Sequence, residues 1–216
     1  MKARHIAISL AALLLCTLSQ AQTNIGVKGG FSGGWTNGVA LLPGARVVPH
    51  PSLYGGIYGN VLFGDNLIAQ LELLYAGKGH SEYTVSDLGK NNYALNMGYL
   101  QIPAMFGVNL ADGKCSVMAG PELGILLHAR EISRTSGPAV EKDIVIKNDY
   151  REYCNAASFG IGIQANYMVL PNLGIDVKFD WGLSRVFKSE ILETLGFKTN
   201  AHQLSAQIGI CYNIEL

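Results

Sequence analysis

The stretch LSAQIGICYNIEL, residues 204–216, alternates between apolar and polar or small side chains along its whole length. Its apolar face consists of Leu204, Ala206, Ile208, Ile210, Tyr212, Ile214 and Leu216. Its other face consists of Ser205, Gln207, Gly209, Cys211, Asn213 and Glu215. A repeat of two residues is typical of a β-strand with one apolar side and one water-facing side. The same alternation recurs along most of the chain, which predicts an all-β protein.

Residues 1–21 have the pattern of a secretory signal peptide, so we expect export of a mature chain, residues 22–216, that forms one domain. The charged start is Lys2 and Arg4, the apolar part is residues 6–18, and Ser19-Gln20-Ala21 supplies small residues for cleavage. The apolar part is shorter than the about 20 residues that a membrane-spanning helix needs. If the mature chain lies in a membrane, it therefore crosses it as strands.

Eight alternating segments predict an eight-stranded antiparallel transmembrane β-barrel in the outer membrane. We expect strands at residues 24–33, 52–64, 67–79, 97–110, 115–129, 157–169, 173–186 and 202–216. Short turns join them at residues 63–66, 111–114 and 170–172, and long polar loops at residues 34–51, 80–96, 130–156 and 187–201. Short turns at one end and long loops at the other are typical of such barrels, with the short turns periplasmic and the long loops extracellular.

One face of the predicted strands carries no charged residue, although 15% of the whole chain is charged. A Lys or Arg at the lipid midplane costs roughly 2–4 kcal/mol, so this face is expected to meet lipid. The other face carries Lys28, Gln70, Glu72, Lys78, Gln101, Glu122, Gln164, Asn166, Asp176, Lys178, Asp180 and Gln207. A soluble lipocalin-type barrel would have the reverse arrangement, with an apolar interior, and is disfavoured.

The interior of an eight-stranded barrel is only wide enough for its own side chains. We therefore expect the charged inner residues to form a plug of ion pairs, made by Lys28, Glu72, Glu122, Asp176, Lys178 and Asp180. A narrow ion path or proton relay is the functional alternative. A general diffusion porin is disfavoured, because porins use about 16–18 strands to leave a channel.

Composition excludes some partners and identifies no cofactor. Basic and acidic residues both number 16, and loss of Lys2 and Arg4 with the signal leaves a slight acidic excess, which does not fit nucleic-acid binding. Cys115, Cys154 and Cys211 remain after cleavage, without the spacing of a metal site, and one disulfide among them is possible. We expect no cofactor and no metal.

Two prolines interrupt the predicted wall. Folding the fourth and fifth strands about the turn at residues 111–114 sets Pro103 nearly opposite Glu122, and Pro121 nearly opposite Ala104. Because a closed barrel has no free edge, each proline is expected to mark a bulge or a local break in strand pairing.

These residues also carry a resemblance to a family. The segments Tyr99-Leu100-Gln101-Ile102-Pro103 and Ala119-Gly120-Pro121-Glu122-Leu123-Gly124 resemble the PorT-like outer-membrane β-barrel family of Bacteroidetes-type bacteria. Gly26-Val27-Lys28-Gly29-Gly30, Gln70-Leu71-Glu72-Leu73-Leu74-Tyr75 and Phe159-Gly160-Ile161-Gly162 are similar as well. The resemblance implies an outer-membrane barrel, and the family's named member acts in secretion across the outer membrane and in gliding-type surface functions. One departure is Leu216, where barrel proteins commonly end in an aromatic residue.

Some small outer-membrane barrels modify lipids or cleave peptides, so an enzymatic function is an alternative for this chain. His80 and His128 have inward parity near the loop end, and His202 begins the last strand there. Ser184, Glu82 and Glu131 are their candidate companions. A hydrolase needs a Ser–His pair oriented by a carboxylate, and nothing in the spacing requires that contact. We therefore expect no enzyme.

The longest loop, residues 130–156, is the best candidate for partner contact. Within it Ile144, Val145 and Ile146 could extend a hairpin above the membrane and pair with a partner strand. The sequence thus predicts a non-enzymatic barrel that contacts outer-membrane lipid and acts as a scaffold or component of an envelope or secretion assembly. The alternative is a stand-alone surface barrel for adhesion or small-ligand contact.

Overall fold

The computed structural model describes residues 22–37, 46–64, 66–86, 89–111, 113–136, 144–188 and 201–214. The predicted signal peptide, residues 1–21, lies outside the described residues. The strands are β1 (Gln22–Asn37), β2 (Arg46–Phe63), β3 (Leu67–Ser86), β4 (Gly89–Leu110), β5 (Cys115–Ser136), β6 (Ile144–Asp149), β7 (Ala157–Met168), β8 (Leu173–Arg185) and β9 (His202–Ile214). A short 3-10 turn, η1 (Arg151–Tyr153), separates β6 from β7.

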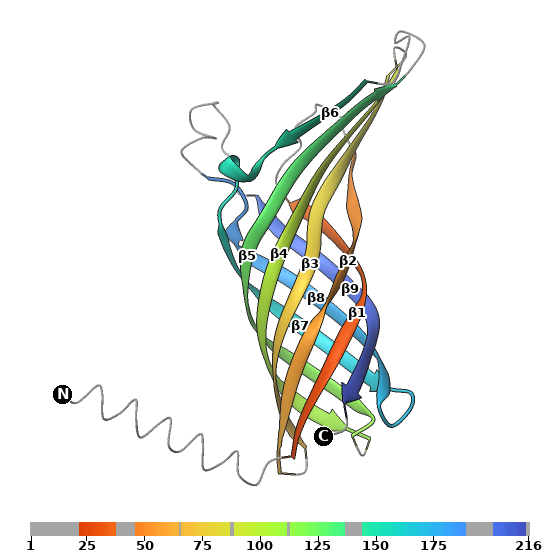
Figure 1. Ribbon diagram of the computed structural model, residues 1–216, viewed down its shortest axis with the longest axis vertical. Coiled ribbons are helices and arrows are strands. Elements are labelled where there is room, and N and C mark those ends of the chain that lie inside the picture. Colours follow the sequence, from red (N-terminus) through yellow and green to blue (C-terminus); the bar gives the residue numbers. More distant parts are fainter. Residues whose placement is uncertain are drawn as a thin grey trace, which may run out of the picture.

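Eight of these strands close into a ring, as the sequence predicts. The neighbours run β4-β3-β2-β1-β9-β8-β7-β5, and the pairing of β4 with β5 completes the barrel (Figure 1). All the pairings in the ring are antiparallel. Among the described residues, no helix is long and apolar enough to cross a membrane.

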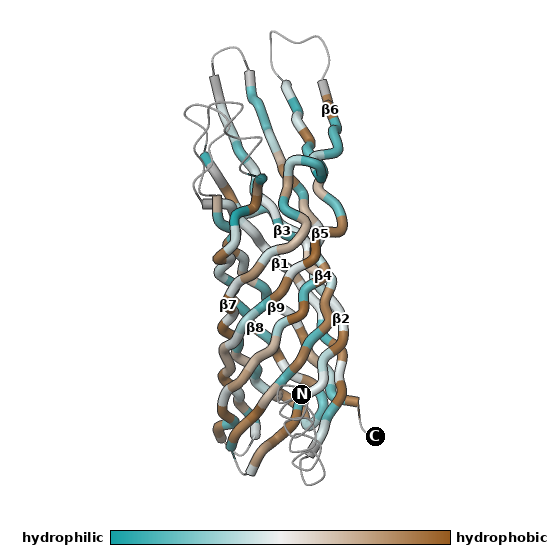
Figure 2. Tube along the Cα trace, turned by 90° about the vertical axis from the view of Figure 1, so that its left-hand side faces the viewer, coloured by the Kyte–Doolittle hydropathy of each residue, from teal (hydrophilic) through white to brown (hydrophobic). Residues whose placement is uncertain are grey.

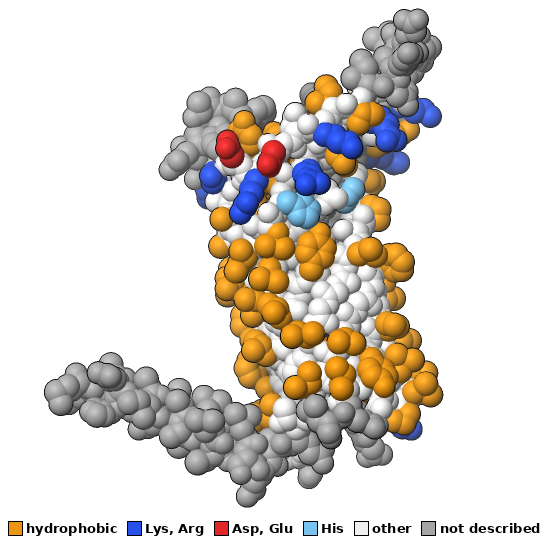
Figure 3. All heavy atoms as spheres, viewed as in Figure 1, with side chains coloured by type: hydrophobic (Ala, Val, Ile, Leu, Met, Phe, Trp, Pro, Cys, Tyr) orange, Lys and Arg blue, Asp and Glu red, His pale blue; other side chains and the backbone are white. Residues whose placement is uncertain are grey.

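The alternation of side chains separates an outer apolar surface from a polar interior. Outward side chains such as Phe31, Ile163 and Trp181 are 70%, 59% and 61% exposed. The tube coloured by hydropathy alternates along the barrel strands (Figure 2), and apolar side chains form a broad belt across the face of the barrel seen in Figure 3. Eleven of the twelve polar residues assigned to the inner face are buried, and Asn166 is half-buried.

The short connections lie at one end of the barrel. Gly64 and Gly113 have φ angles of 60° and 83°, in the left-handed region that favours glycine, and they lie in the turns after β2 and β4. Ile25 near the start of β1 pairs with Ile214 at the end of β9, so the start of the first strand and the end of the last strand also lie at this end (Figure 1).

The prediction of long loops is partly wrong, because several strands continue into the predicted loop regions. Residues 80–86 pair with residues 89–95, and residues 90–96 pair with residues 130–136. At the two sides of this sheet, residues 46–49 pair with β3 and residues 144–149 form β6 on β5. We call these extensions, residues 46–49, 80–86, 89–96, 130–136 and 144–149, the wing; its strands extend beyond the other strands of the ring (Figure 1), on the far side of the apolar belt (Figure 3). Above the lipid a strand needs no strict apolar face, so the period-two signal weakens while backbone pairing continues.

Candidate functional site

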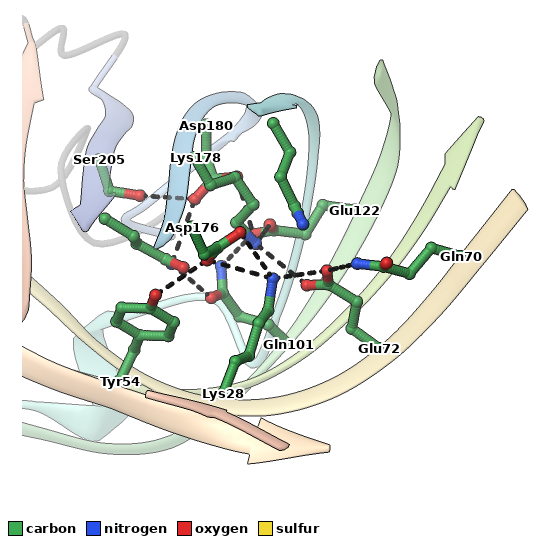
Figure 4. A network of polar contacts seen from close by, with 12 residues as sticks. Lys28, Tyr54, Gln70, Glu72, Gln101, Glu122, Asp176, Lys178, Asp180 and Ser205 are labelled. Carbon is green, nitrogen blue, oxygen red and sulfur yellow. Dashed lines mark hydrogen bonds and ion pairs between the residues drawn. The ribbon is translucent and has the colours of Figure 1, made fainter. Parts of the chain in front are cut away.

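The barrel interior contains all six residues predicted for the plug. Lys28 lies on β1, Glu72 on β3 and Glu122 on β5, and β8 contributes Asp176, Lys178 and Asp180. The three residues on β8 are two positions apart, so the pleat directs them all inward. Each of the six is at most 5% exposed. Figure 4 shows their side chains converging from different walls of the barrel.

Two lysines tie the carboxylates into one network. Lys28 Nζ donates to Glu72 Oε1 at 2.6 Å and lies 3.3 Å from Asp176 Oδ1. Lys178 Nζ donates to Glu122 Oε2 at 3.0 Å and lies 3.9 Å from Glu72 Oε2. Glu72 therefore lies between the two lysines, and the contacts connect β1, β3, β5 and β8 across the lumen.

Lys78 is a seventh member of this network that the predicted plug omits. Its Nζ atom donates to Glu122 Oε1 at 2.9 Å and lies 3.8 Å from Asp180 Oδ2. The inward parity of Lys78 on β3 was visible in the sequence, but its Cα lies three inward positions beyond Glu72, toward the loop end. Only the length of the lysine side chain brings its charge to the same level as Glu122.

Uncharged donors add hydrogen bonds to each of the carboxylates. They are Tyr54 toward Asp176 (2.8 Å), Gln70 toward Glu72 (2.6 Å), Ser205 toward Asp180 (3.0 Å) and Gln101 toward Glu122. Gln207 in turn donates to the Gln101 side-chain oxygen at 3.0 Å. Taking an ion out of water costs several kcal/mol, and ion partners together with these hydrogen bonds offset that cost. The cluster is therefore fixed in place rather than solvated.

The network holds more negative than positive groups. Its three lysines are Lys28, Lys78 and Lys178, and its four carboxylates are Glu72, Glu122, Asp176 and Asp180. If all seven groups are ionised, one negative charge is in excess. An anion entering the lumen would therefore meet both a filled interior and a repulsive charge.

Apolar layers lie on both sides of the network. The inward residues of β4 change from Tyr93, Leu95, Met97 and Tyr99 at the loop end, through Gln101, to Met105 toward the turns. The upper four belong to a buried cluster with Leu126, Ala129, Cys154, Val186, Phe187 and Ala201. Met105 packs with Ile68 and Met118. Two apolar layers and one ionic layer thus lie across the lumen, and a cavity of about 120 Å³, lined by residues that include Tyr58, Asn60 and Asn213, lies below them at the turn end.

The two prolines lie on opposite faces of the wall. Pro103 is buried in the interior and pairs with Glu122, whereas Pro121 is exposed on the outside. The pairing of β3 with β4 is interrupted between Leu71↔Ala104 and Leu74↔Gln101, the interval that contains Pro103. The pairing of β4 with β5 is interrupted between Pro103↔Glu122 and Phe106↔Ala119, the interval that contains Pro121. The register is the same on both sides of each gap, so each proline lies at a break without a bulge.

The predicted inward orientation of His128 is wrong. A register shift between Gly98↔His128 and Tyr99↔Leu126 leaves Leu127 as an extra residue on β5. This bulge reverses the facing of the residues that follow it. The His128 ring stacks on outward Tyr75, with 6.3 Å between ring centroids, over the surface of Gly98. The sequence contains no clear sign of this bulge.

The candidate catalytic residues do not assemble as a serine hydrolase would require. Ser184 Oγ accepts a hydrogen bond from the Phe159 backbone N–H at 2.9 Å. His80 Nδ1 lies 2.9 Å from Thr36 Oγ1, and His80 Nε2 lies 3.6 Å from Glu82 Oε1. This hydroxyl–imidazole–carboxylate order imitates a catalytic triad. However, the three residues are at most 2% exposed, so they cross-link the wall without access for a substrate.

His202 and Glu131 make different contacts. His202 pairs with Arg185 and Asn37 at the start of β9, and the Glu131 carboxylate accepts a hydrogen bond from Asn148 of β6 at 3.5 Å. Sequence analysis did not consider His50, whose Nδ1 lies 3.0 Å from Ser81 Oγ. Among the described residues, no ion pair joins a carboxylate to His50.

The predicted contact segment, residues 144–146, forms the first half of β6. Ile144, Val145 and Ile146 pair with Thr135, Arg134 and Ser133 of β5. Val145 and Ile146 are 45% and 51% exposed. Among the described strands, β6 pairs with β5 along one edge and with none along its other edge.

The segment after β6 turns back over the mouth of the barrel. Cys154 forms a β-bridge with Phe187, and both side chains are buried in the upper apolar cluster. Burial raises the pKa of the Cys154 thiol to about 12. Cys115, Cys154 and Cys211 are all free thiols, so the structure contains none of the disulfides that these three cysteines could form.

Several known proteins are similar to this chain. Solved structures similar to this chain include Ail, the attachment invasion locus protein of Yersinia pestis (10% identity, 89% of this chain and 99% of that chain covered, TM-score 0.45). Neisserial surface protein A (9%, 88% and 98%, 0.43) and OprG of Pseudomonas aeruginosa (12%, 91% and 98%, 0.40) are also similar. No curated protein sequence matches the chain. Residues 19–188 match the family described as "Outer membrane protein beta-barrel domain", which places the protein in the outer membrane. The chain therefore belongs to the outer membrane protein beta-barrel domain family.

Proposed function

We propose that this protein is a non-enzymatic, closed barrel that holds the wing above the outer membrane for contact with other envelope proteins. The observation that carries the proposal is the contrast between the two halves of the molecule. The lumen is filled by the Lys28–Glu72–Lys178 network and its apolar layers, whereas the strands of the wing continue beyond the lipid belt. The elaborated part of the molecule is thus the part outside the membrane.

The open edge of β6 is the proposed contact. An edge strand presents unpaired backbone N–H and C=O groups that can add a strand from another chain. Val145 and Ile146 place exposed apolar side chains on this edge, 45% and 51% exposed. The resemblance to the PorT-like family supports a role as one component of an envelope or secretion assembly.

A matched pair of substitutions tests this contact. We would isolate the tagged barrel from its native outer membrane in mild detergent and quantify the proteins that co-purify with it. Val145→Lys places a charge on the β6 edge, whereas Tyr153→Lys changes a similarly exposed apolar residue (41%) in η1, away from that edge. We expect a near-stoichiometric partner with wild type and Tyr153→Lys, and its loss with Val145→Lys. A barrel that purifies alone would contradict the assembly role and favour a stand-alone surface barrel for adhesion or small-ligand contact.

A further inference from the structure

Exposed cations outnumber exposed acids at the extracellular end of the molecule. Among the described residues, the exposed acids are Asp149 and Glu152. The exposed cations at this end are Arg46, Lys90, Arg130, Arg134, Lys147, Arg151, Arg185 and Lys188. Figure 3 shows Lys and Arg side chains gathered directly beyond the apolar belt. This end of the barrel therefore favours partners that carry negative charge.

The strand register places two arginines on the outer face of the wing, three strands apart. One row across the sheet reads Arg46 on β2, Tyr83 on β3, Asn92 on β4 and Arg134 on β5. Directly paired residues share one face of an antiparallel sheet. This face is the outer one, because Asn92 is exposed while the following Tyr93 is buried in the lumen cluster. At the usual strand spacing, the Cα atoms of the two arginines are roughly 14 Å apart.

The two arginines lie at the ends of a groove with an aliphatic floor. A depression of about 500 Å³ is lined by both arginines and by Val48, Ala94 and Ile132, which form the adjacent row of the same face. Glu82 also borders the depression, but its side chain is buried on the inner side, beside His80. Among the described residues, neither arginine forms an ion pair. The groove thus runs across the strands, with an unpaired cation at each end.

The groove lies well outside the membrane. Leu127, 43% exposed, is an apolar residue on the outer surface of β5, and Arg134 follows seven residues later. Seven residues span roughly 23 Å along a strand, and the usual tilt of barrel strands leaves roughly 16–19 Å of height. The polar headgroup region of a bilayer is only about 5–8 Å thick on each side. The groove is therefore presented to molecules outside the bilayer.

We propose that this groove binds an extended segment of a partner protein with two acidic residues four positions apart and an apolar residue midway between them. Four residues of extended chain span about 13–14 Å, which matches the separation of the two arginines. Side chains two positions apart share one face of an extended chain, so all three point into the groove together. Each arginine pairs with one carboxylate through two parallel hydrogen bonds, and the apolar residue covers the aliphatic floor.

The aliphatic floor favours a protein segment over an anionic glycan. An apolar side chain covers Val48, Ala94 and Ile132 without leaving a polar group unpaired, whereas the hydroxyl groups of a sugar there would lose water without gaining a partner. The inference deepens the proposed function and rests on it in taking the occupant to be a protein. The β6 edge gives the place where a partner adds a strand, and the groove gives a charge pattern that the partner carries.

Binding of a synthetic peptide to the full-length barrel tests the groove without the native partner. The fluorescein-labelled peptide has two aspartates four positions apart, a valine midway between them and threonine elsewhere. A control peptide has the same composition with the aspartates adjacent. Both are titrated against the barrel in dodecyl maltoside at low salt and followed by fluorescence anisotropy.

Two double variants remove the same number of charges. Arg46→Gln with Arg134→Gln removes both groove arginines, whereas Arg185→Gln with Lys188→Gln removes two exposed cations elsewhere at the same end. A compact band in unheated gel samples verifies folding. A double variant that lacks this band is replaced by its two single substitutions.

Wild type is expected to bind the spaced peptide at least about tenfold more tightly than the control peptide. Each groove substitution costs about fivefold in affinity, and because the two sites are far enough apart to act independently, the double variant loses about 25-fold. The control double variant stays within about twofold of wild type. Arg46→Glu with Arg134→Glu reverses the preference, in favour of a peptide with lysines in place of the aspartates.

Three results would each overturn the proposal: equal affinity for the two aspartate peptides, equal losses in the two double variants, or tighter binding of an oligogalacturonate than of the spaced peptide. The last would make the occupant an anionic glycan. Peptide binding and co-purification fail separately. A barrel that purifies alone but binds the spaced peptide contradicts the assembly role and keeps the groove, whereas a barrel with a stoichiometric partner and no peptide binding contradicts the groove alone.

Discussion

Lys178 Nζ donates to Glu122 Oε2 at 3.0 Å across the centre of the barrel, and the Lys178 side chain is fully buried. The same ammonium lies 3.5 Å from Asp180 Oδ1 and 3.9 Å from Glu72 Oε2. One cation therefore faces three carboxylates in a lumen without bulk water. These contacts hold strands β3, β5 and β8 together across the lumen.

Removal of the Lys178 charge should destabilise the barrel strongly. Lys178→Met keeps most of the side-chain volume but leaves buried carboxylates without their common partner, at a cost of about 3–5 kcal/mol in the free energy of unfolding. Urea unfolding in lipid vesicles measures the change. The exposed Lys147→Met serves as the control and should stay within about 0.5 kcal/mol of wild type. Equal stabilities for both variants would mean that the network does not stabilise the fold.

The lipid belt can be located by arginine substitution. Ile163→Arg places a charge at a position that is 59% exposed in the middle of β7, and we expect a loss of roughly 2–4 kcal/mol. Val145→Arg, on the wing, should cost less than about 0.5 kcal/mol, because its side chain meets water. The same unfolding assay compares them. A tolerated Ile163→Arg would place that part of β7 outside the hydrocarbon layer.

The burial of Cys154 predicts a thiol with little reactivity. Its pKa is raised to about 12 by burial, so the thiol stays protonated at pH 7–9 and the reactive thiolate is scarce. A chain that retains only Cys154 should react slowly with maleimide when folded and quickly in urea. A chain that retains only Cys115, which is half-buried at the turn end, serves for comparison. Fast labelling of folded Cys154 would show that the segment after β6 does not cover the mouth.

The bulge at Leu127 predicts an intolerant glycine on the outer face of β4. A Cβ atom at Gly98 would collide with the His128 ring and approach the Tyr75 hydroxyl at 2.9 Å. Gly98→Ala should therefore cost about 1–3 kcal/mol through overpacking. Gly33→Ala is the control, because the nearest atom there is Pro49 Cβ at an ordinary 3.6 Å. Equal stability of both variants would argue against the stacked position of His128.

The alternation of apolar and polar residues was sufficient to predict the strands of the barrel wall, but it did not predict how far those strands extend at the loop end. Within the lipid belt each side chain points either to lipid or into the lumen. The alternation along the strand is therefore enough to predict that Ile163 points outward and Lys178 inward. Above the belt this constraint is absent, and residues 80–96 and 130–136, expected as loops, continue as paired strands. Their hydrogen bonds are made by the backbone, which leaves little trace in side-chain pattern.

The plug shows the same limit on a smaller scale. Parity identified Lys28, Glu72 and Glu122 as neighbours in the lumen, because their Cα atoms lie at similar height. It could not include Lys78, whose side chain reaches Glu122 from a higher level. Nor could it place His128, because one extra residue at Leu127 reverses the facing of everything after it.

Ion conductance tests the closed barrel most directly. Purified wild-type protein would be inserted into planar lipid bilayers, with a general porin in the same membranes as a positive control and with gel mobility showing that the inserted barrel is folded. Because side chains fill the lumen from Tyr99 through Lys178 to Met105, we predict no conductance step above the noise in 1 M KCl. Stable, ohmic single-channel steps would contradict the account and make the charged interior an ion path.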